Sequence, residues 1–496
     1  MAANAQGGSR RPSSGGRSDG GRQGGGAPRG ERDQRPARID PARRAAYDVT
    51  YAVETEDGYA NLLMPGILKQ HRLSGRDAGF ATELAYGALR GRGLYDAIIA
   101  DAAKRRTDTL DIDLVVALRL GVHQALAMRV PAHAAVSETV DLVRSVNGRA
   151  AGLANAVMRR VTERDLDTWL ARVAPGTSRE SQAIRHSHPA WVVGELEHAL
   201  TADGRPGELT QLLEADNAPA SVTLVARPGL IDRDALLEQA DGAATVYSPL
   251  GVSLSGGAPG DIEAVGEGTA AVQDEGSQIA ALALVHADAA IPGRADAGVG
   301  SRIDPGERWL DMCAGPGGKA ALLAAAASEG MASLEALELH EHRAALVRRS
   351  LKAIPEGVAT VHRADARTWE PSEPYDRILL DAPCTGLGAL RRRPEARWRR
   401  SIDDLDDLVD LQHALIAHAG SLLAEGGVLA YVTCSPVLAE TLDVVRDSGL
   451  AVLDTRLAVA SATGTQPTEW GHGPHVQLWP HAHGTDAMFI QLLTRA

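Results

Sequence analysis

The hydrophobic and polar positions follow a helical period through the first long part of the chain. Between residues 37 and 175, apolar side chains return at helical spacing, as at Leu114, Leu118 and Val122. Pro131 separates two of these stretches. Amphipathic helices of this kind bury their apolar faces against one another, so the pattern predicts a compact all-α bundle over residues 37–175.

The pattern changes to short apolar strands in the last part of the chain, residues 265–496. The strand-like stretches are, in order, RWLDMCA, SLEALEL, ATVHRAD, YDRILLDAP and GGVLAYVTCS. Helical stretches such as GGKAALLAAAAS and EHRAALVRRSLKA lie between them. Repeated strand–helix units predict a parallel, doubly wound α/β sheet, and ligands bind such a sheet beyond the carboxyl ends of its strands.

Three further segments complete the expected organisation. Residues 1–36 consist largely of Gly, Ser and Arg, which predicts a disordered tail. Residues 176–264 combine a helical stretch, HPAWVVGELEHAL, with a strand-like one, APASVTLVARPG, so we expect a small α/β module. A further helix is expected from Asp274, and residues 285–306, rich in Gly and Asp, are expected to form a surface insertion.

Composition narrows the class of protein. A chain of 496 residues has room for about two to four domains. The 3 Cys are far apart, which argues against a disulfide framework and a Cys-rich zinc site, so we expect no metal and a cytoplasmic location. No run of roughly eighteen apolar residues appears, so no membrane association is expected. The formal net charge of −13 disfavours a general nucleic-acid binder, although the charge is unevenly distributed.

The loop DMCAGPGGK, residues 311–319, lies between a predicted strand and a predicted helix. Its glycines let the backbone approach a ligand, and it matches neither Walker A nor GxGxxG. Glu338 ends the next strand, where an acid suits ribose hydroxyls, and Asp365 ends the third, where it can meet an adenine amino group. Together these features predict an adenosine-containing cofactor. The candidate cofactor-binding residues are Cys313, Ala314, Gly315, Pro316, Gly317, Gly318, Lys319, Glu338, Asp365 and Asp381.

The order of the helical phrases resembles a known RNA-binding fold. FATELAYG from Phe80, RVPAHAAV from Arg129 and NAVMRR from Asn155 match, phrase by phrase, the NusB-like domain of a transcription antitermination factor. The resemblance implies contacts with RNA or ribosomal proteins within residues 37–175. The alternative is that the arginines of these helices only solvate their outer faces.

Two motifs at strand ends resemble an enzyme family. DAPCTGLG, from Asp381, follows the fourth predicted strand, and TCSP, from Thr433, follows the fifth. With the loop 311–319 they resemble the RNA 5-methylcytosine methyltransferases of the RsmB/Sun (NOP2/Sun) family, and the NusB-like part matches its bacterial ribosomal RNA branch. The resemblance covers residues 37–496, apart from the predicted insertion. It implies a class I, Rossmann-like methyltransferase domain that uses S-adenosylmethionine.

The reaction that the resemblance implies is methyl transfer to carbon 5 of a cytosine in 16S rRNA. Carbon 5 is too electron-poor to attack a methyl sulfonium, whereas addition of a thiolate to carbon 6 makes the ring nucleophilic. Two cysteines compete for this addition; the resembled family uses the one at Cys434 to attack and the one at Cys384 to assist product release. Asp381 is suited to hydrogen-bonding the cytosine, with Lys319 in support. Cys313 is interpreted as a residue that packs at a strand end.

Positive charge is concentrated directly after the fourth-strand motif. The candidate RNA-binding residues are Arg391, Arg392, Arg393 and Arg397. Their place beside the Cys384 loop favours RNA contact, and the alternative is a solvated basic helix.

The expected partner is small-subunit rRNA, and a monomer is expected. The rival interpretations are a tRNA cytosine-5 methyltransferase and a non-catalytic NusB-like RNA-binding factor; the intact cysteine motifs argue against the second. The resembled loop has Ala where Gly315 stands, a difference that is expected to be harmless. The resembled branch also carries an acid at the position of Glu440, to which the sequence assigns no role.

Overall fold

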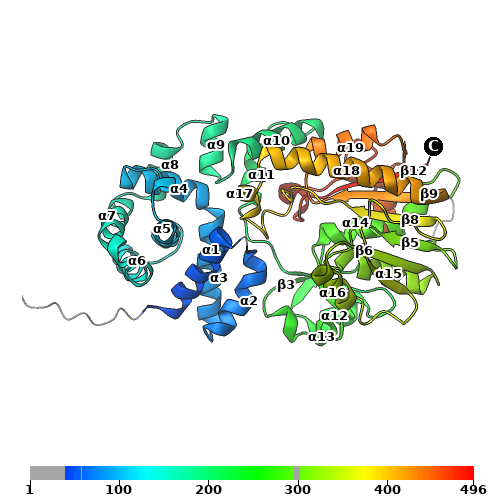
Figure 1. Ribbon diagram of the computed structural model, residues 1–496, viewed down its shortest axis with the longest axis horizontal. Helices are drawn as coiled ribbons and strands as arrows, with labels where there is room; N and C mark the ends of the chain where they lie inside the picture. The colour runs from blue at the N-terminus through cyan, green and yellow to red at the C-terminus, as the bar shows by residue number, and fades with distance from the viewer. Residues whose placement is uncertain (1–38, 57, 295–301, 496) are drawn as a thin grey trace, which may run out of the picture. The chain divides into compact units, whose positions relative to one another are not determined.

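The computed structural model describes residues 39–56, 58–294 and 302–495. The predicted tail, residues 1–36, and the middle of the predicted insertion therefore lie outside the described residues. Figure 1 shows the helices and strands of the described chain. Within these residues, no helix has the length and apolar character needed to cross a bilayer.

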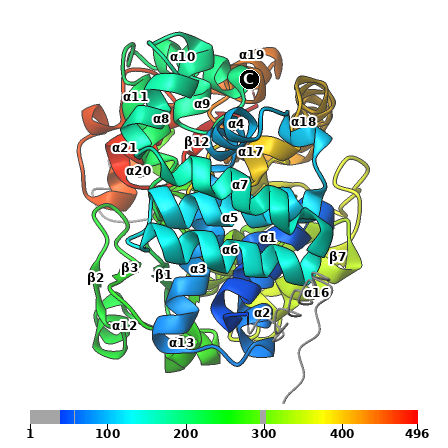
Figure 2. The same ribbon diagram turned by 90° about the vertical axis from the view of Figure 1, so that its left-hand side faces the viewer.

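The first part of the described chain is built of helices, as the apolar spacing predicts. They are α1 (Pro41–Thr55), α2 (Ala60–Gln70), α3 (Gly75–Arg90), α4 (Arg92–Ala103), α5 (Ile112–Leu126), α6 (Ala132–Val146), α7 (Ala151–Thr162) and α8 (Leu166–Val173), with 3-10 turns at Thr107–Thr109 and Gly148–Ala150. Helix α5 is buried continuously from Leu114 to Gln124, and Figure 2 shows it among α1, α3, α6 and α7. A helix that is buried on all sides lies in a central position, so α5 forms the core of the bundle.

A helical segment and a small antiparallel sheet follow. The helices are α9 (Arg179–Arg185), α10 (Ala190–Ala202), α11 (Leu209–Ala215), α12 (Arg233–Gln239) and α13 (Glu263–Glu267), with a 3-10 turn at Pro259–Asp261. The strand order is β2-β3-β1-β4, with β1 (Thr223–Ala226), β2 (Gly242–Ala244), β3 (Gly251–Leu254) and β4 (Ala270–Val272). Strand β4 pairs with β1, so the small sheet continues beyond the boundary predicted at residue 264.

The larger sheet contains the strands that the sequence predicts. They are β5 (Arg308–Asp311), β6 (Ser333–Glu338), β7 (Ala359–Arg363), β8 (Tyr375–Asp381) and β9 (Leu423–Thr433), parallel in the order β7-β6-β5-β8-β9. Beyond β9 the sheet continues with β12 (Phe489–Thr494), β10 (Ala451–Val452) and β11 (Val476–Gln477), all paired antiparallel. The sheet is therefore mixed rather than wholly parallel, because the C-terminal strand returns beside β9 in the opposite direction.

Side chains on the two faces of the sheet enter two separate apolar layers. In β9, Val428, Ala430 and Val432 belong to one buried cluster, and Leu429 and Tyr431 belong to the other. The first layer includes α14 (Glu275–Val285), α15 (Gly318–Glu329), α16 (Glu341–Ser350) and α20 (Thr455–Thr463). The second includes α18 (Ile402–Leu422) and α19 (Leu442–Asp447), and Figure 1 shows α15 and α18 on opposite faces. Burial of both faces explains why the strands are continuous apolar runs. The remaining helices of this part are α17 (Ala396–Arg399) and α21 (Pro480–His483), with 3-10 turns at Ala287–Ala290, Leu438–Glu440 and Pro467–Trp470.

The predicted surface insertion, residues 285–306, begins inside the core. Ala287 is buried in the apolar layer that contains α14. The buried guanidinium of Arg377, on β8, donates to the carbonyl of Val285 over 2.8 Å. The prediction is therefore wrong for the start of this segment, because its carbonyls satisfy a cation inside the domain. Residues 295–301 lie outside the described part of the chain.

Candidate active site

Two cysteines meet where two neighbouring strands end. Strands β8 and β9 are parallel, with Asp381 opposite Val432, so the residues that follow them emerge at the same edge of the sheet. Cys384 lies in the loop after β8, and Cys434 directly follows β9. Their Sγ atoms are 3.4 Å apart. The first, fourth and fifth predicted strands are neighbours in the order β5-β8-β9, and this order brings the two thiols together.

The two thiols differ in acidity because one donates to the other. The hydrogen bond between the two sulfurs lowers the pKa of Cys434 and raises the pKa of Cys384, so we assign the S–H donor to Cys384. Burial and the charge of Asp381 oppose the lowering at Cys434, whereas Lys319 and Arg393 support it. Cys434 is therefore the sulfur that more readily exists as a thiolate, which is the nucleophilic form of cysteine.

A lysine and two aspartates adjoin the thiols. Lys319 donates from Nζ to Oδ2 of Asp381 over 2.8 Å. Burial lowers the pKa of Lys319, but Asp381, Cys434 and Asp311 outweigh it and raise the pKa. Burial and the charge of Asp381 raise the pKa of Asp311 to about 7. Oδ2 of Asp311 is buried and has no hydrogen-bond partner among the described residues, so it is suited to accept from a bound molecule.

The glycine loop between β5 and α15 lies tightly against β6 and α16. A Cβ on Gly315 would lie 2.1 Å from Oε2 of Glu338 and 2.9 Å from the Arg343 guanidinium. Arg343 donates to the carbonyl of Gly315 over 2.8 Å and pairs with Glu338 over 3.4 Å. A Cβ here would have to displace the ends of these two side chains, and the expectation that the difference from the resembled loop is harmless stays a prediction. Gly317 has φ +111°, a backbone conformation that residues other than glycine rarely adopt.

The other predicted cofactor-binding residues surround this loop. Cys313 packs against the apolar layer that contains α18, and burial raises the pKa of its thiol. The carbonyl of Pro316 accepts a hydrogen bond from the Ser350 hydroxyl over 3.2 Å. Asp365, beyond β7, pairs with Arg367 over 2.6 Å. The glycine cradle, the acid that ends β6 and the unpartnered carboxylate oxygen of Asp311 fit an adenosine-containing cofactor with an amino group.

Comparison with known proteins identifies the family. The family model for the 16S rRNA methyltransferase RsmB/F matches residues 302–494, and the NusB family model matches residues 40–163. A putative methyltransferase of Mycobacterium tuberculosis is 44% identical over 465 residues, which cover 92% of this chain and 97% of that protein. The ribosomal RNA small subunit methyltransferase B of Pseudomonas putida is 32% identical over 418 residues, which cover 82% and 88%. The chain belongs to the RsmB/F family of 16S rRNA methyltransferases.

The RsmB/F assignment agrees with the architecture. The crystal structure of PH0851 matches with a TM-score of 0.74 at 21% identity, over 92% of this chain and 99% of that one. At this identity the match shows a shared fold. The predicted multidomain fold, an all-α NusB-like bundle before a Rossmann-like methyltransferase domain, is confirmed, as is the resemblance to the family.

One arginine of this RsmB/F chain that was predicted to contact RNA is inside the protein. Arg397 is completely buried. It donates to the carbonyl of Ser187 over 3.2 Å and to Oδ1 of Asn217 over 2.8 Å. The prediction is wrong for Arg397, because its guanidinium satisfies acceptors of the segment that leads to the small sheet.

The other predicted RNA-binding arginines have different surroundings. Arg391 and Arg392 pair with Asp486, at 3.7 and 3.2 Å. Arg392 also pairs with Asp274, the N-cap of α14. These contacts hold the loop after β8 to the loop before β12, so the two side chains serve the protein's own packing. Arg393 is exposed, and RNA contact stays a prediction for it.

Sequence reasoning gave no role to several residues that the structure brings to the site. Arg343 joins the glycine loop to Glu338. Gln412 and Glu440 lie behind the cysteine loops. Only the acid at Asp274, just before a predicted helix, carried a local signal, that of an N-cap. The others come from helices whose sequence shows no sign of which loop they approach.

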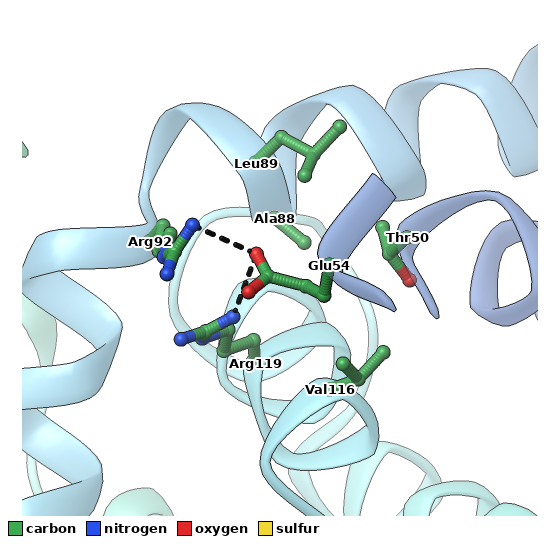
Figure 3. A pocket seen from close by; sticks show the side chains of 7 residues that line it. All are labelled: Thr50, Glu54, Ala88, Leu89, Arg92, Val116 and Arg119. Carbon is green, nitrogen blue, oxygen red and sulfur yellow. Dashed lines mark ion pairs between the residues drawn. The ribbon is translucent and has the colours of Figure 1, made fainter. Parts of the chain in front are cut away.

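A small hollow in the helical bundle contains a set of charges that compensate one another. Glu54 pairs with Arg92 over 3.0 Å and with Arg119 over 3.1 Å (Figure 3). Arg119 also pairs with Asp96 over 2.7 Å. We interpret this set as structural, since each cation has a carboxylate partner. Over the described ranges, no group of three or more His, Cys, Asp or Glu is arranged to hold a metal ion.

Proposed function

We propose that the chain transfers a methyl group from S-adenosylmethionine to carbon 5 of a cytosine in 16S rRNA, through a covalent bond between Cys434 and carbon 6. The observation that carries the proposal is the pair of sulfurs 3.4 Å apart at the ends of β8 and β9. A thiol that ionises readily can add to the ring and a second thiol that keeps its proton can assist the elimination, whereas direct methyl transfer needs neither.

The residues around the sulfurs suit the two halves of this reaction. The Cys434 thiolate forms a bond to carbon 6, and electron density moves to carbon 5. Asp381 accepts a hydrogen bond from the cytosine amino group, and the Lys319 ammonium, which holds Asp381, balances the charge that develops on the ring. After methylation, the carbon-5 proton leaves to water and the bond to Cys434 breaks. The S–H of Cys384 stabilises the departing thiolate.

The cofactor proposal uses the residues around the glycine loop. Bound S-adenosylmethionine supplies an electrophilic methyl group. The backbone of residues 313–319 is proposed to line its site, with Glu338 on the ribose and Asp365 near the adenine. Asp311 is suited to the amino group of the methionine part, because its buried Oδ2 has no partner in the described residues.

The RNA proposal combines the helical bundle with the site. A NusB family model matches residues 40–163, and the Pseudomonas putida relative is named for the small ribosomal subunit. We therefore propose that residues 37–175 and Arg393 contact small-subunit rRNA. The proposed division of the chain keeps a small module from residue 176, extended to the end of β4, before the methyltransferase domain. A cytoplasmic monomer remains our proposal for the state of the enzyme.

Trapping of the covalent intermediate tests the roles of the cysteines. Cys384→Ala is expected to accumulate a protein–RNA adduct that survives denaturing electrophoresis, because addition proceeds while elimination is slow. Cys434→Ala is expected to form none. The wild-type chain serves as the control and should turn over without accumulating an adduct. Adduct formation by Cys434→Ala but not by Cys384→Ala would reverse the assignment, and methylation without either thiol would remove the covalent step.

Bisulfite sequencing of RNA from a deletion strain tests the substrate. Loss of one 5-methylcytosine from 16S rRNA is the expected result. Loss from tRNA instead would identify a tRNA methyltransferase. No loss from any RNA, with RNA binding by the purified chain retained, would favour a non-catalytic NusB-like binding factor.

A further inference from the structure

A completely buried carboxylate lies behind the two cysteines. Glu440 ends the 3-10 helix Leu438–Glu440 that follows β9. Its carboxylate accepts from neutral donors, on Thr385 and Gln412. Burial raises its pKa, and these hydrogen bonds oppose the rise. Burying a carboxylate without a neighbouring cation costs free energy. The role of Glu440 at this position is therefore better explained by its hydrogen bonds than by packing.

The Glu440 carboxylate binds Thr385, next to Cys384, and Thr385 in turn contacts Ser435, next to Cys434. Oε1 accepts the backbone N–H of Thr385 over 2.7 Å, and Oε2 accepts the Thr385 hydroxyl over 2.5 Å. The Thr385 hydroxyl lies 3.1 Å from the hydroxyl of Ser435. Thr385 follows Cys384 and Ser435 follows Cys434, so this chain of contacts crosses between the two loops one residue beyond each sulfur.

Glu440 is itself fixed from two sides. Gln412, on α18, donates to Oε1 of Glu440 over 3.3 Å and to the carbonyl of Pro383 over 2.8 Å. The hydroxyl of Tyr431, on β9, donates to the Glu440 carbonyl over 2.7 Å. Gln412 and Tyr431 are completely buried. Because Gln412 and Tyr431 are packed too tightly to change rotamer, they fix the position of Glu440. The Glu440 carboxylate in turn fixes the groups that donate to it.

We propose that Glu440 is a positioning residue for methyl transfer, which holds the Cys384 thiol in hydrogen-bond contact with the Cys434 sulfur. The effect on turnover rests on the function proposed above, whereas the effect on the thiols does not. The donor at Cys384 favours the Cys434 thiolate only while the 3.4 Å contact lasts. Without the carboxylate, the Thr385 N–H loses its buried acceptor and the loop that carries Cys384 is released.

The pH profile of Cys434 alkylation by iodoacetamide tests this proposal, with peptide mass spectrometry as the readout and Cys313 as an internal reference. In Glu440→Ala the Cys434 profile moves to higher pH, because its thiolate has lost a donor. The kcat for methyl transfer to rRNA falls at least about tenfold, with the KM for RNA unchanged within about threefold. Glu440→Gln keeps the volume and one acceptor oxygen, so it recovers most of both properties.

Thr385→Val keeps the test decisive if Glu440→Ala does not fold. It removes one hydrogen bond of the carboxylate without changing the shape of the side chain, and it moves the Cys434 profile in the same direction. In the double variant Glu440→Ala/Thr385→Val, the fold decrease in kcat is smaller than the product of the two single-variant decreases, because both substitutions break the same chain of contacts. Asp447→Ala is the matched control, because this half-exposed acid of α19 pairs only with Arg446 among its described contacts.

Two results would overturn the role of Glu440. One is an unchanged Cys434 profile in folded Glu440→Ala or in Thr385→Val. The other is a loss of activity that appears in the KM for RNA alone. If the wild-type chain methylates no cytosine at carbon 5, the proposed function fails instead, and the alkylation profiles still decide whether Glu440 positions the thiols.

Discussion

Three thiols of the same intrinsic acidity stand in three environments near one edge of the sheet. Burial raises the pKa of Cys313. Cys384 is assigned as the donor of a hydrogen bond to Cys434, which raises the pKa of Cys384 and lowers the pKa of Cys434. The difference comes from which groups surround each sulfur, since an isolated cysteine has a pKa of about 8.5. The surroundings of each sulfur therefore determine how readily its thiol ionises.

The first prediction concerns the titration of Cys434. In the wild-type chain, Cys434 should react with iodoacetamide at lower pH than Cys313, because a lowered pKa gives a thiolate at lower pH. Cys384→Ala removes the donor and raises the pKa of Cys434, so its reaction profile should move to higher pH and its rate at pH 7 should fall. Thiol alkylation followed by mass spectrometry measures both sulfurs in one sample. A Cys434 profile that moves to lower pH would contradict the assignment of Cys384 as the hydrogen-bond donor.

A second prediction at this scale concerns the glycine loop. Gly315→Ala places a Cβ 2.1 Å from Oε2 of Glu338, so the carboxylate must move. We expect the Kd for S-adenosylmethionine to rise about tenfold, or about 1.4 kcal/mol, measured by isothermal titration calorimetry. Gly152→Ala on α7, where a Cβ meets no atom within 4 Å, should bind as the wild type does. Equal affinity for Gly315→Ala would show that the acid is not needed in its present position.

Among the elements, the segment 391–400 acts as a connector between parts of the protein. Arg392 pairs with acids from α14 and from the loop before β12. Arg397 reaches the acceptors of the segment before the small sheet, and Arg399 donates to the carbonyl of Val53 over 3.2 Å. Guanidinium groups suit this role because each has several donors in a rigid plane. A run of arginines that reads as an RNA-binding surface is thus used largely for internal contacts.

The prediction for this segment concerns stability. Arg397→Ala leaves buried acceptors without a donor and should lower the free energy of unfolding by about 3 kcal/mol, measured by urea denaturation. Burial raises the pKa of Asp216 to about 7, and the charge of Arg397 opposes the rise. An acid with a raised pKa in the folded state loses stability as pH rises from its unfolded value, about 3.9, to its folded value. Without Arg397 that folded value is higher still, so the deficit should grow above pH 7.

The control for this prediction is a nearby arginine of the same run. Arg400→Ala, at a half-buried position, should change the free energy of unfolding by no more than about 0.5 kcal/mol. A deficit for Arg397→Ala that is equally small, or that shrinks above pH 7, would contradict the buried role of this guanidinium.

Across the whole molecule, the helical bundle and the catalytic domain share one set of contacts. The ring of Tyr59 lies 5.5 Å from the Arg393 guanidinium and 4.6 Å from that of Arg399. Oε1 of Glu395 accepts the backbone N–H of Ala60 over 3.1 Å. Arg393 and Glu395 lie between β8 and α17, in the segment that also carries Cys384, and Arg399 ends α17. The proposed RNA-binding bundle is therefore attached to the catalytic loop through a few side chains.

The prediction at this scale concerns that attachment. Tyr59→Ala removes two cation–π contacts, each worth about 0.5–1 kcal/mol. Hydrogen exchange should become faster in α2 and in residues 391–400, and the KM for rRNA should rise while kcat stays near the wild-type value. Leu62→Ala on the same helix, where the side chain is 72% exposed, is the control and should alter neither. Exchange that is unchanged in Tyr59→Ala would show that these contacts do not couple the two parts.

The sequence by itself was sufficient for the helices of the bundle, for the five parallel strands and for most of the motif placements. The apolar spacing of α5 and the continuous apolar run of β9 depend only on nearby residues, since helical and strand periods are local properties. The strand-end positions of Asp381, Glu338 and Cys434 follow from the same periods. Because parallel strands align their carboxyl ends, the sequence also placed both cysteine motifs at one edge of the sheet.

The tertiary structure alone decided what each side chain at that edge contacts. Arg393 and Arg397 are four residues apart in one basic run, yet one is exposed and the other is buried, because the burial of a side chain depends on which distant segment packs over it. The same holds for Glu440, whose partner Thr385 is 55 residues away. Local patterns determine the period and the direction of an element. The contacts between elements arise only when the whole chain packs, and the acidity of the two thiols follows from those contacts.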